Sequence, residues 1–335
     1  MENASVDATN EKVSLGYNKR KSAVGWFGQL RDDTGGWELF ADGTMSQVWL
    51  QTGGTFCSTH CVFCARQRND EKLGLFPNSS GVQHTEVVAK TAKREEYQTL
   101  IEREIGLLLY AASPLIMPVS AFIKSTRGPM LVMPRMATDL KGYIQGVLGM
   151  PTMKNRYRVL GFVFQAIEHL HTLQIAHLDI KPENVMLTHI DGGVRLCDLG
   201  LSLAHTALLD RSRLEQPDQI RGTNGWRSPE MTRKWFCRQS DIYSAALTAF
   251  ATLIPGFNLF NPIYANSGLG TLEGDLGAGL SVEPSQRPLA SVMAGHLEEA
   301  YHTAGVTSGR AWTAPDSSPG VFWCDCHLQN ETVNN

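Results

Sequence analysis

Two short segments near the middle of the chain hold carboxylate, amide and ammonium side chains at close spacing: HLDIKPEN at 177–184 and DLG at 198–200. Apolar runs on either side of the turn DGG at 191–193 predict a β-hairpin between these segments. Because a hairpin brings its two ends together, we expect Asn184 and Asp198 to lie close to each other. Carboxylate and amide oxygens suit a hard cation such as magnesium.

The order and spacing of the two segments resemble the catalytic loop and the metal-binding motif of the protein kinase superfamily. The resemblance implies that Asp179 orients a substrate hydroxyl and accepts its proton, and that Lys181 contacts the γ-phosphate of ATP. It also implies that Asn184 and Asp198 hold Mg²⁺. Phosphoryl transfer needs an aligned hydroxyl and neutralised phosphate charge rather than covalent help. A lysine two places after the aspartate is similar to serine/threonine kinases rather than tyrosine kinases.

A second resemblance lies upstream, in VAK at 88–90 and EIGLL at 104–108. It implies that Lys90 grips the α- and β-phosphates and that Glu104, on a helix, pairs with this lysine. The spacing between the two is a few residues shorter than is usual in kinases. A surface helix with exchangeable charges therefore stays open as the alternative.

The segment LVMPRM at 131–136 resembles the strand and hinge that hold adenine in kinases. The resemblance implies that Met133 is the gatekeeper, that Met136 supplies backbone hydrogen bonds, and that Asp139 lies near the ribose. An apolar strand followed by an ordinary loop is the alternative.

The loop that should cradle phosphate departs from the kinase pattern. Kinases place three spaced glycines there, because backbone amides must approach the phosphates without an intervening side chain. Here Ala41, Gly43 and Ser46 occupy those positions, followed by Val48, so that only Gly43 matches. Small residues still permit approach, and we expect weakened rather than absent ATP binding. A plain turn between strands is the alternative.

Later segments resemble the large lobe of a kinase: GTNGWRSPE at 222–230, SDIYS at 240–244 and PSQRP at 284–288. The resemblance implies a buried ion pair between Glu230 and Arg287, which is structural rather than catalytic. The glycine-rich stretch 255–280 shows little helical pattern, although kinases usually carry a helix there.

Leu178 stands where many kinases have an arginine that clamps a phosphate on the activation segment. We therefore expect phosphorylation of Thr206 or Ser212 to matter little for activity.

Five cysteines lie in two clusters, Cys57, Cys61 and Cys64 in one and Cys324 and Cys326 in the other. Together they could complete a structural Zn²⁺ site, with free cysteines in a reducing compartment as the alternative. The first cluster also has the spacing by which radical-SAM enzymes hold an iron–sulfur cluster. That fold needs a barrel of repeated strand-helix units, whereas kinase motifs already occupy the rest of the chain.

The elements that must position these residues form a β-rich half and a helical half. Alternation over 37–50 predicts two strands, and apolar steps of three and four residues over 155–173 predict a long helix. With the resemblance, they predict an α+β, bilobal kinase-like fold with a small β-rich N-lobe and a larger, mostly helical C-lobe. The predicted boundaries are a polar arm at 1–30, an N-lobe at 31–135 with an insertion at about 51–84, a C-lobe at 136–300 and a tail at 301–335.

The composition and charge of the chain indicate which classes of partner to expect. A net charge of −3 provides no field that would attract nucleic acid. The apolar run 243–254 is too short to span a bilayer, and no apolar signal region is visible near the start. We therefore expect an intracellular protein of the cytoplasm or nucleus whose partners are ATP and protein substrates, not nucleic acid or membrane.

The resemblance as a whole implies a serine/threonine protein kinase that uses ATP and Mg²⁺. The alternative is a pseudokinase that acts as a protein-binding scaffold, because two glycines of the phosphate loop are missing and Leu178 replaces an arginine. These departures are similar to kinases of large DNA viruses, particularly herpesvirus-like ones, which would place the protein in a host cell.

Overall fold

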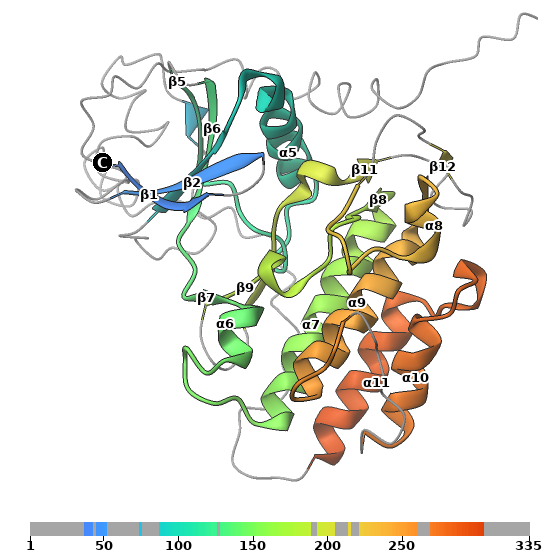
Figure 1. The fold of residues 1–335 in the computed structure, drawn as a ribbon. Coiled ribbons are helices and arrows are strands. Elements are labelled where there is room, and N and C mark those ends of the chain that lie inside the picture. The colour runs from blue at the N-terminus through green and yellow to red at the C-terminus, as the bar shows by residue number, and fades with distance from the viewer. Residues whose placement is uncertain are drawn as a thin grey trace, which may run out of the picture. The chain divides into compact units, whose positions relative to one another are not determined.

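The computed structural model describes residues 37–42, 45–51, 74–75, 87–125, 128–188, 193–204, 214–215, 221–259 and 269–304. Contacts divide the described chain into two units, one ending at Arg135 and the other beginning at Met136 (Figure 1). The predicted arm, nearly all of the insertion and the tail beyond 304 lie outside the described residues, together with Gly43, Thr206, Ser212 and all five cysteines of the zinc hypothesis.

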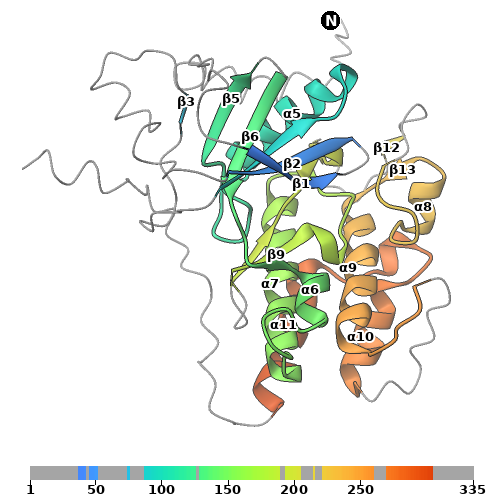
Figure 2. The ribbon, with the colours of Figure 1, turned by 60° about the vertical axis from the view of Figure 1, so that its left-hand side comes forward.

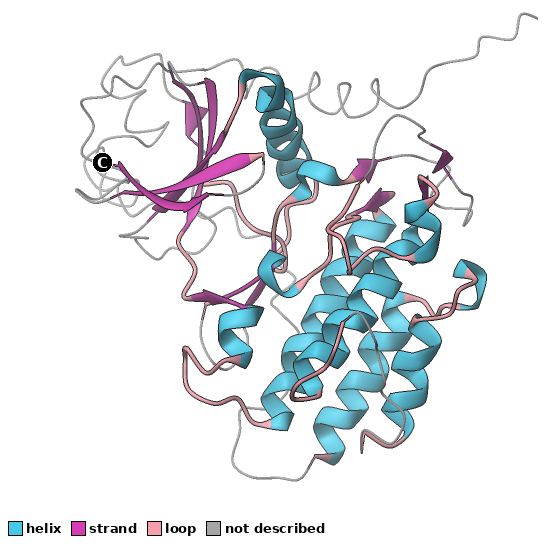
Figure 3. Cartoon of the chain, viewed as in Figure 1, coloured by secondary structure: helices cyan, strands magenta, loops and turns pink. Residues whose placement is uncertain are grey.

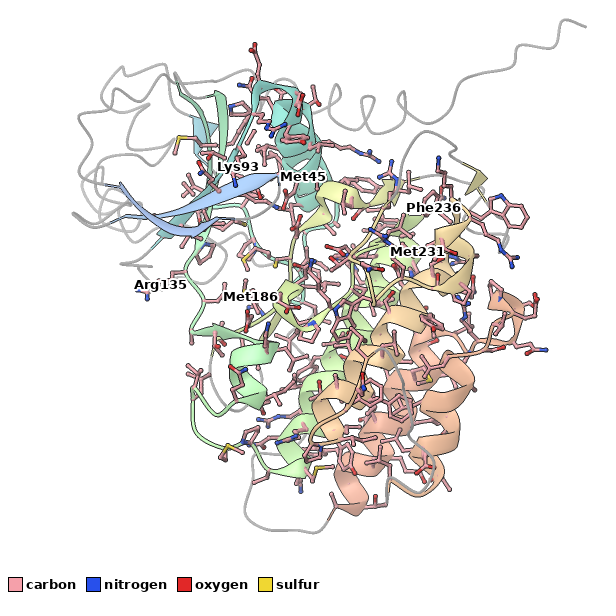
Figure 4. The ribbon with its side chains drawn as sticks, viewed as in Figure 1. Met45, Lys93, Arg135, Met186, Met231 and Phe236 are labelled. Atoms are coloured by element: carbon pink, nitrogen blue, oxygen red, sulfur yellow. The ribbon has the colours of Figure 1, made fainter. Side chains whose placement is uncertain are left out.

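The first unit is an antiparallel sheet with the strand order β1-β2-β4-β6-β5-β3, drawn in magenta in Figure 3. Its strands are β1 (Trp37–Asp42), β2 (Ser46–Gln51), β3 (Gly74–Leu75), β4 (Val87–Ala92), β5 (Ala121–Ser125) and β6 (Gly128–Pro134). Strand β4 has mostly buried residues because it lies inside the sheet. The N–H of Lys93 donates to the carbonyl of Met45 (2.9 Å) beyond the ends of β4 and β2; both residues are labelled in Figure 4.

One helix packs on this sheet. A 3₁₀ turn, η1 (Glu95–Tyr97), leads into α5 (Gln98–Tyr110), which contacts β4 and β6. The buried residues of α5 recur at three- and four-residue steps and include Ile101, Ile105 and Leu108, so one face of the helix covers the sheet.

The second unit is mainly helical, as the cyan elements of Figure 3 show. Its helices are α6 (Leu140–Ile144), α7 (Met153–Thr172), α8 (Pro229–Thr232), α9 (Arg238–Leu253), α10 (Thr271–Gly279) and α11 (Ala290–Thr303). Helices α7 and α11 run side by side (Figures 1 and 2), and α9 packs on both α7 and α10. The long helix predicted over 155–173 is thereby confirmed within two residues.

Helix α10 corrects the expectation for 255–280, where the sequence showed little helical pattern. The helix was not predicted because its glycines have a low helix propensity. A Cβ atom on Gly279 would lie only 2.8 Å from the Cβ of Ala246 on α9, so this glycine permits close helix packing. Close packing between helices favours the small residue although its helix propensity is low.

Short strands and 3₁₀ turns fill the rest of the second unit. They are β7 (Thr138–Asp139), β8 (Ile175–Ala176), η2 (Pro182–Asn184), β9 (Val185–Leu187), β10 (Val194–Leu196), η3 (Leu199–Leu201), β11 (Leu203–Ala204), β12 (Leu214–Glu215), β13 (Trp235–Phe236) and η5 (Pro284–Gln286). Strands β9 and β10 pair antiparallel, which confirms the predicted hairpin. None of the helices in the described segments is long and apolar enough to cross a membrane.

Candidate catalytic site

The loop from 177 to 181 is held by one buried carboxylate. Asp241 of α9, which is fully buried, accepts hydrogen bonds from the backbone N–H groups of His177 (2.8 Å) and Leu178 (2.7 Å). The ring of His171 lies 2.9 Å from the same carboxylate. Leu178 adopts a positive φ of 65°, an uncommon conformation for a residue with a side chain. These contacts fix the backbone immediately before Asp179.

Asp179 is the centre of a compact polar network. Its Oδ2 accepts from Lys181 Nζ (2.9 Å) and Asn184 Nδ2 (3.0 Å), and its Oδ1 accepts from the hydroxyl of Thr223 (2.7 Å). Lys181 Nζ also donates to Thr223 Oγ1 (2.6 Å). Asp179 is only 5% exposed, so this carboxylate is a buried acceptor held in place by its donors. A carboxylate so placed can orient a hydroxyl group.

The hairpin brings Asn184 and Asp198 close together, as the sequence predicts. The N–H of Cys197 donates to the carbonyl of Asn184 (3.0 Å), and the ring of His177 contacts the carbonyl of Cys197 (2.9 Å). Asp198 has φ 65° and ψ 67°, and its side chain accepts from the N–H of Gly200 (3.4 Å). A left-handed residue of this kind is often part of a functional site.

The oxygen atoms at this point fit a magnesium ion. The Nδ2 of Asn184 donates hydrogen bonds to the side chain of Asp179 and to its backbone carbonyl (2.7 Å). Its Oδ1, at the other end of the amide, and the carboxylate of Asp198 are hard oxygen donors. Within the described ranges there is no cluster of three or more His, Cys, Asp or Glu side chains suited to a metal, and the five zinc candidates lie outside those ranges.

In the first unit, Lys90 and Glu104 meet despite their shortened spacing. Lys90 Nζ donates to both carboxylate oxygens of Glu104, at 3.0 and 2.8 Å, and the two residues are 7% and 1% exposed. Val48 on β2 pairs directly with Lys90 on β4, and Ala41 on β1 pairs with Val48 in the strand register. Ser46 is the first residue of β2, and Gly43 lies outside the described residues.

The predicted hinge residues fall in both units. Met133 is buried on β6 and pairs with Val88 of β4. Met136 and Asp139 belong to the second unit, where the carboxylate of Asp139 caps α6 by accepting from the N–H of Gly142 (2.7 Å). The contact of Asp139 with a ribose stays a prediction.

The ion pair implied for Glu230 and Arg287 is present. Arg287 donates through two nitrogens to the two oxygens of Glu230, at 2.7 and 2.8 Å, and Ser240 adds a hydroxyl donor at 2.7 Å. Burial alone raises the pKa of Glu230, but the hydrogen bonds and charge of Arg287, with the serine hydroxyls, outweigh it and lower that pKa.

Two important contacts were missed from the sequence. Thr223 was recognised only as part of a motif, and its hydrogen bond to Asp179 spans 44 residues of chain. Asp241 was recognised only as part of the start of a helix. The polar residue types in these two motifs were the available signal, but no local pattern showed their partners.

Comparison with known proteins identifies the family. The protein kinase domain matches residues 81–267, more than half of the chain, and the chain belongs to this family. Similar proteins include rhodopsin kinase GRK7 of Bos taurus, 34% identical over 164 residues, which are 45% of this chain and 28% of that protein.

Two further relatives come from other organisms. Serine/threonine-protein kinase PrkC of Bacillus subtilis is 30% identical over 101 residues, 30% of this chain and 15% of the relative. Serine/threonine-protein kinase mos of Patiria pectinifera is 26% identical over 167 residues, 49% of this chain and 46% of the relative. In each of the three comparisons, the chain spans less than half of the relative's length.

Proposed function

We propose that this chain is a serine/threonine protein kinase that transfers the γ-phosphoryl group of ATP to protein hydroxyls. The network of Asp179 with Lys181, Asn184 and Thr223 carries the proposal. In this network the carboxylate of Asp179 lies beside the ammonium group of Lys181 and the side-chain amide of Asn184, which supports a role for Asp179 as proton acceptor. Membership of the protein kinase family supports the same reaction class.

Each residue of the network has a distinct proposed role. Asp179 orients the attacking hydroxyl and accepts its proton, while the Lys181 ammonium neutralises charge on the γ-phosphate. Asn184 and Asp198 would hold Mg²⁺, which supplies charge neutralisation on the phosphate oxygens when bound. Thr223 holds Asp179 and Lys181 in register through its hydroxyl.

The nucleotide-gripping roles belong to the first unit and the hinge. Lys90 binds the α- and β-phosphates, and Glu104 keeps its ammonium in place through the buried ion pair. The remaining proposed nucleotide contacts are Ala41, Gly43, Ser46, Val48, Met133, Met136 and Asp139.

The choice of serine and threonine over tyrosine rests on Lys181, two places after Asp179, which resembles the pattern of serine/threonine kinases, and on the serine/threonine kinases among the similar proteins. Protein substrates and a relationship to herpesvirus-like kinases are parts of the proposal that come from sequence resemblance, and an intracellular location is proposed from the composition.

Phosphate transfer from ATP to casein, followed by phosphoamino acid analysis, tests the function. We expect phosphoserine and phosphothreonine from the unchanged chain, and none from Asp198→Ala. Asp275→Asn is the matched control, because Asp275 is a partly exposed carboxylate that pairs with His296 on α11. A silent wild-type chain that still binds a protein partner without nucleotide would instead favour the pseudokinase scaffold.

A further inference from the structure

A buried arginine joins the two ends of the segment between Asp198 and Thr223. Arg221, 4% exposed, donates from Nη1 to the carbonyl of Leu201 (2.6 Å) and, more weakly, to that of Ser202 (3.4 Å). These residues are about 20 positions apart in the chain. A buried guanidinium needs such acceptors, because its desolvation is otherwise costly.

The first end of the segment continues directly from the proposed metal ligand. Asp198 leads into η3, which ends at Leu201, and the N–H of Ser202 donates to the carbonyl of Leu199 (3.1 Å). The hydroxyl of Ser202 donates to the carbonyl of His177 in the catalytic loop (3.1 Å). The carbonyls that Arg221 binds are therefore fixed to the loop that carries Asp179.

The second end leads to the hydroxyl that contacts Asp179. Gly222 has a φ of +77°, and a Cβ atom there would lie 2.6 Å from the carbonyl oxygen of Leu178. Arg227 holds this turn from outside, donating from Nε to the carbonyls of Arg221 (2.9 Å) and Gly222 (2.8 Å). The next residue, Thr223, bonds to Asp179. Because only Gly222 separates Arg221 from Thr223, a shift of Arg221 should also shift Thr223.

A buried apolar cluster that contains Leu178 lies on one side of Arg221. Leu178 packs in a buried cluster with Ala176, Leu203, Met231 and Phe236. Met231 on α8 and Phe236 on β13 are labelled in Figure 4. The guanidinium carbon of Arg221 lies 6.0 Å from the centre of the Phe236 ring, at the outer limit of a cation–π contact.

We propose that Arg221 is a positioning residue for phosphoryl transfer. Arg221 joins the segment after Asp198 to the turn before Thr223. It thereby holds the proposed metal ligand Asp198 and the Thr223 contact to Asp179 in one arrangement, without phosphorylation of the segment between them. The inference rests on the proposed kinase function, and it assigns to Arg221 the hydrogen bonds that join the two ends of this segment.

The test compares Arg221→Met, Arg221→Lys and the control Arg233→Met in the full chain. Methionine resembles the aliphatic stem of the arginine side chain but has no hydrogen-bond donors, whereas lysine keeps a charged donor that can still bind one carbonyl. Arg233 is an exposed arginine at the end of the neighbouring helix α8. Two readouts are used: hydrogen–deuterium exchange and steady-state kinetics with casein.

We expect Arg221→Met to speed amide exchange by roughly tenfold or more in 199–204 and 221–226, because the carbonyls at one end lose their donor. Exchange in α7 and α9 should stay unchanged. The kcat should fall about tenfold to a hundredfold, the range expected when a hydrogen bond from a charged group is lost, with the KM for ATP within about twofold. Lysine should restore a large part of kcat, and Arg233→Met should match the wild-type chain.

Three results would overturn the inference. One is unchanged exchange at both ends in Arg221→Met, and another is equal loosening of α7 and α9, which would mean a general loss of stability. The third is no recovery of kcat with lysine. If the unchanged chain transfers no phosphate, the proposed function fails and the kinetic role falls with it, whereas the exchange pattern still decides whether Arg221 holds the segment.

Discussion

The proposed catalytic loop in the second unit and the proposed phosphate grip in the first unit are built very differently. Asp179 has three side-chain donors, and its loop is held by the buried carboxylate of Asp241. Lys90 forms a buried ion pair with Glu104, and the sequence of the proposed phosphate loop has a single glycine of the usual three. From this difference we expect the residues proposed for chemistry to be strongly fixed and the affinity for nucleotide to be weakened.

The largest effect is expected at Asp179. Replacing it with Asn keeps the shape but removes the proton acceptor, and kcat should fall about 10²–10⁴-fold while the KM for ATP changes little. Steady-state kinetics with casein measure both constants. A variant that loses ATP affinity but keeps kcat would break the assignment of chemistry to this unit.

Arg287→Met tests how firmly the second unit is braced. Removing one partner of a buried ion pair typically costs about 3–5 kcal/mol, because Glu230 would remain buried without its cation. Urea denaturation should show this loss, and Arg233→Met provides a matched control at an exposed position. A loss below about 1 kcal/mol, the range of exposed pairs, would contradict the account.

Acid should weaken the same ion pair. The pKa of Glu230 is lowered in the folded protein, so its stabilisation is complete above the unfolded carboxyl value of about 4.3 and is lost as the pH falls through the folded value. We expect the unfolding free energy of the wild-type chain to drop faster below about pH 4 than that of Glu230→Gln. Parallel curves for the two proteins would remove Glu230 from this pH dependence.

Glu104→Gln tests the grip of the first unit. Glutamine keeps the length of the side chain but not its charge, so the Lys90 ammonium loses its ionic partner in a buried setting. We expect kcat/KM for ATP to fall by about tenfold to a hundredfold, and thermal stability to fall as well. Glu102→Gln, on the exposed side of the same helix, is the control. Equal kinetics for the two variants would show that the ion pair has no part in nucleotide binding.

The smallest effect is expected when the phosphate loop is made more typical. Ser46→Gly should allow closer backbone approach and lower the KM for ATP by a factor of about two to five, with kcat unchanged. An unchanged or higher KM would indicate that the missing glycines are not what limits affinity.

Most of the fold could be predicted from patterns of residues that are close in sequence. The hairpin between Asn184 and Asp198 and the apolar period of α7 each depend on residues close in sequence, so both were predictable. The ion pair of Lys90 with Glu104 was also found, because the motif around each residue is distinctive.

Contacts between distant segments were not predictable in the same way. Thr223 reaches Asp179, and Arg221 reaches Leu201, across chain that carries no periodic pattern. Helix α10 was missed because its glycines lower the expected helix propensity. Gly279 is needed for close packing against Ala246 on another helix, and the sequence of one helix does not reveal that contact.

The central claim of the proposed function is that Lys90, Asn184 and Asp198 bind the same metal-bound nucleotide. Mn²⁺ can replace Mg²⁺ in complex with ATP, and its unpaired electrons broaden the NMR signals of nearby amides. With Mn²⁺-ATP we predict broadening at 184 and 198–200 of the second unit together with 90 of the first, and its loss on adding excess Mg²⁺. Broadening confined to one unit, or located away from these residues, would contradict the claim.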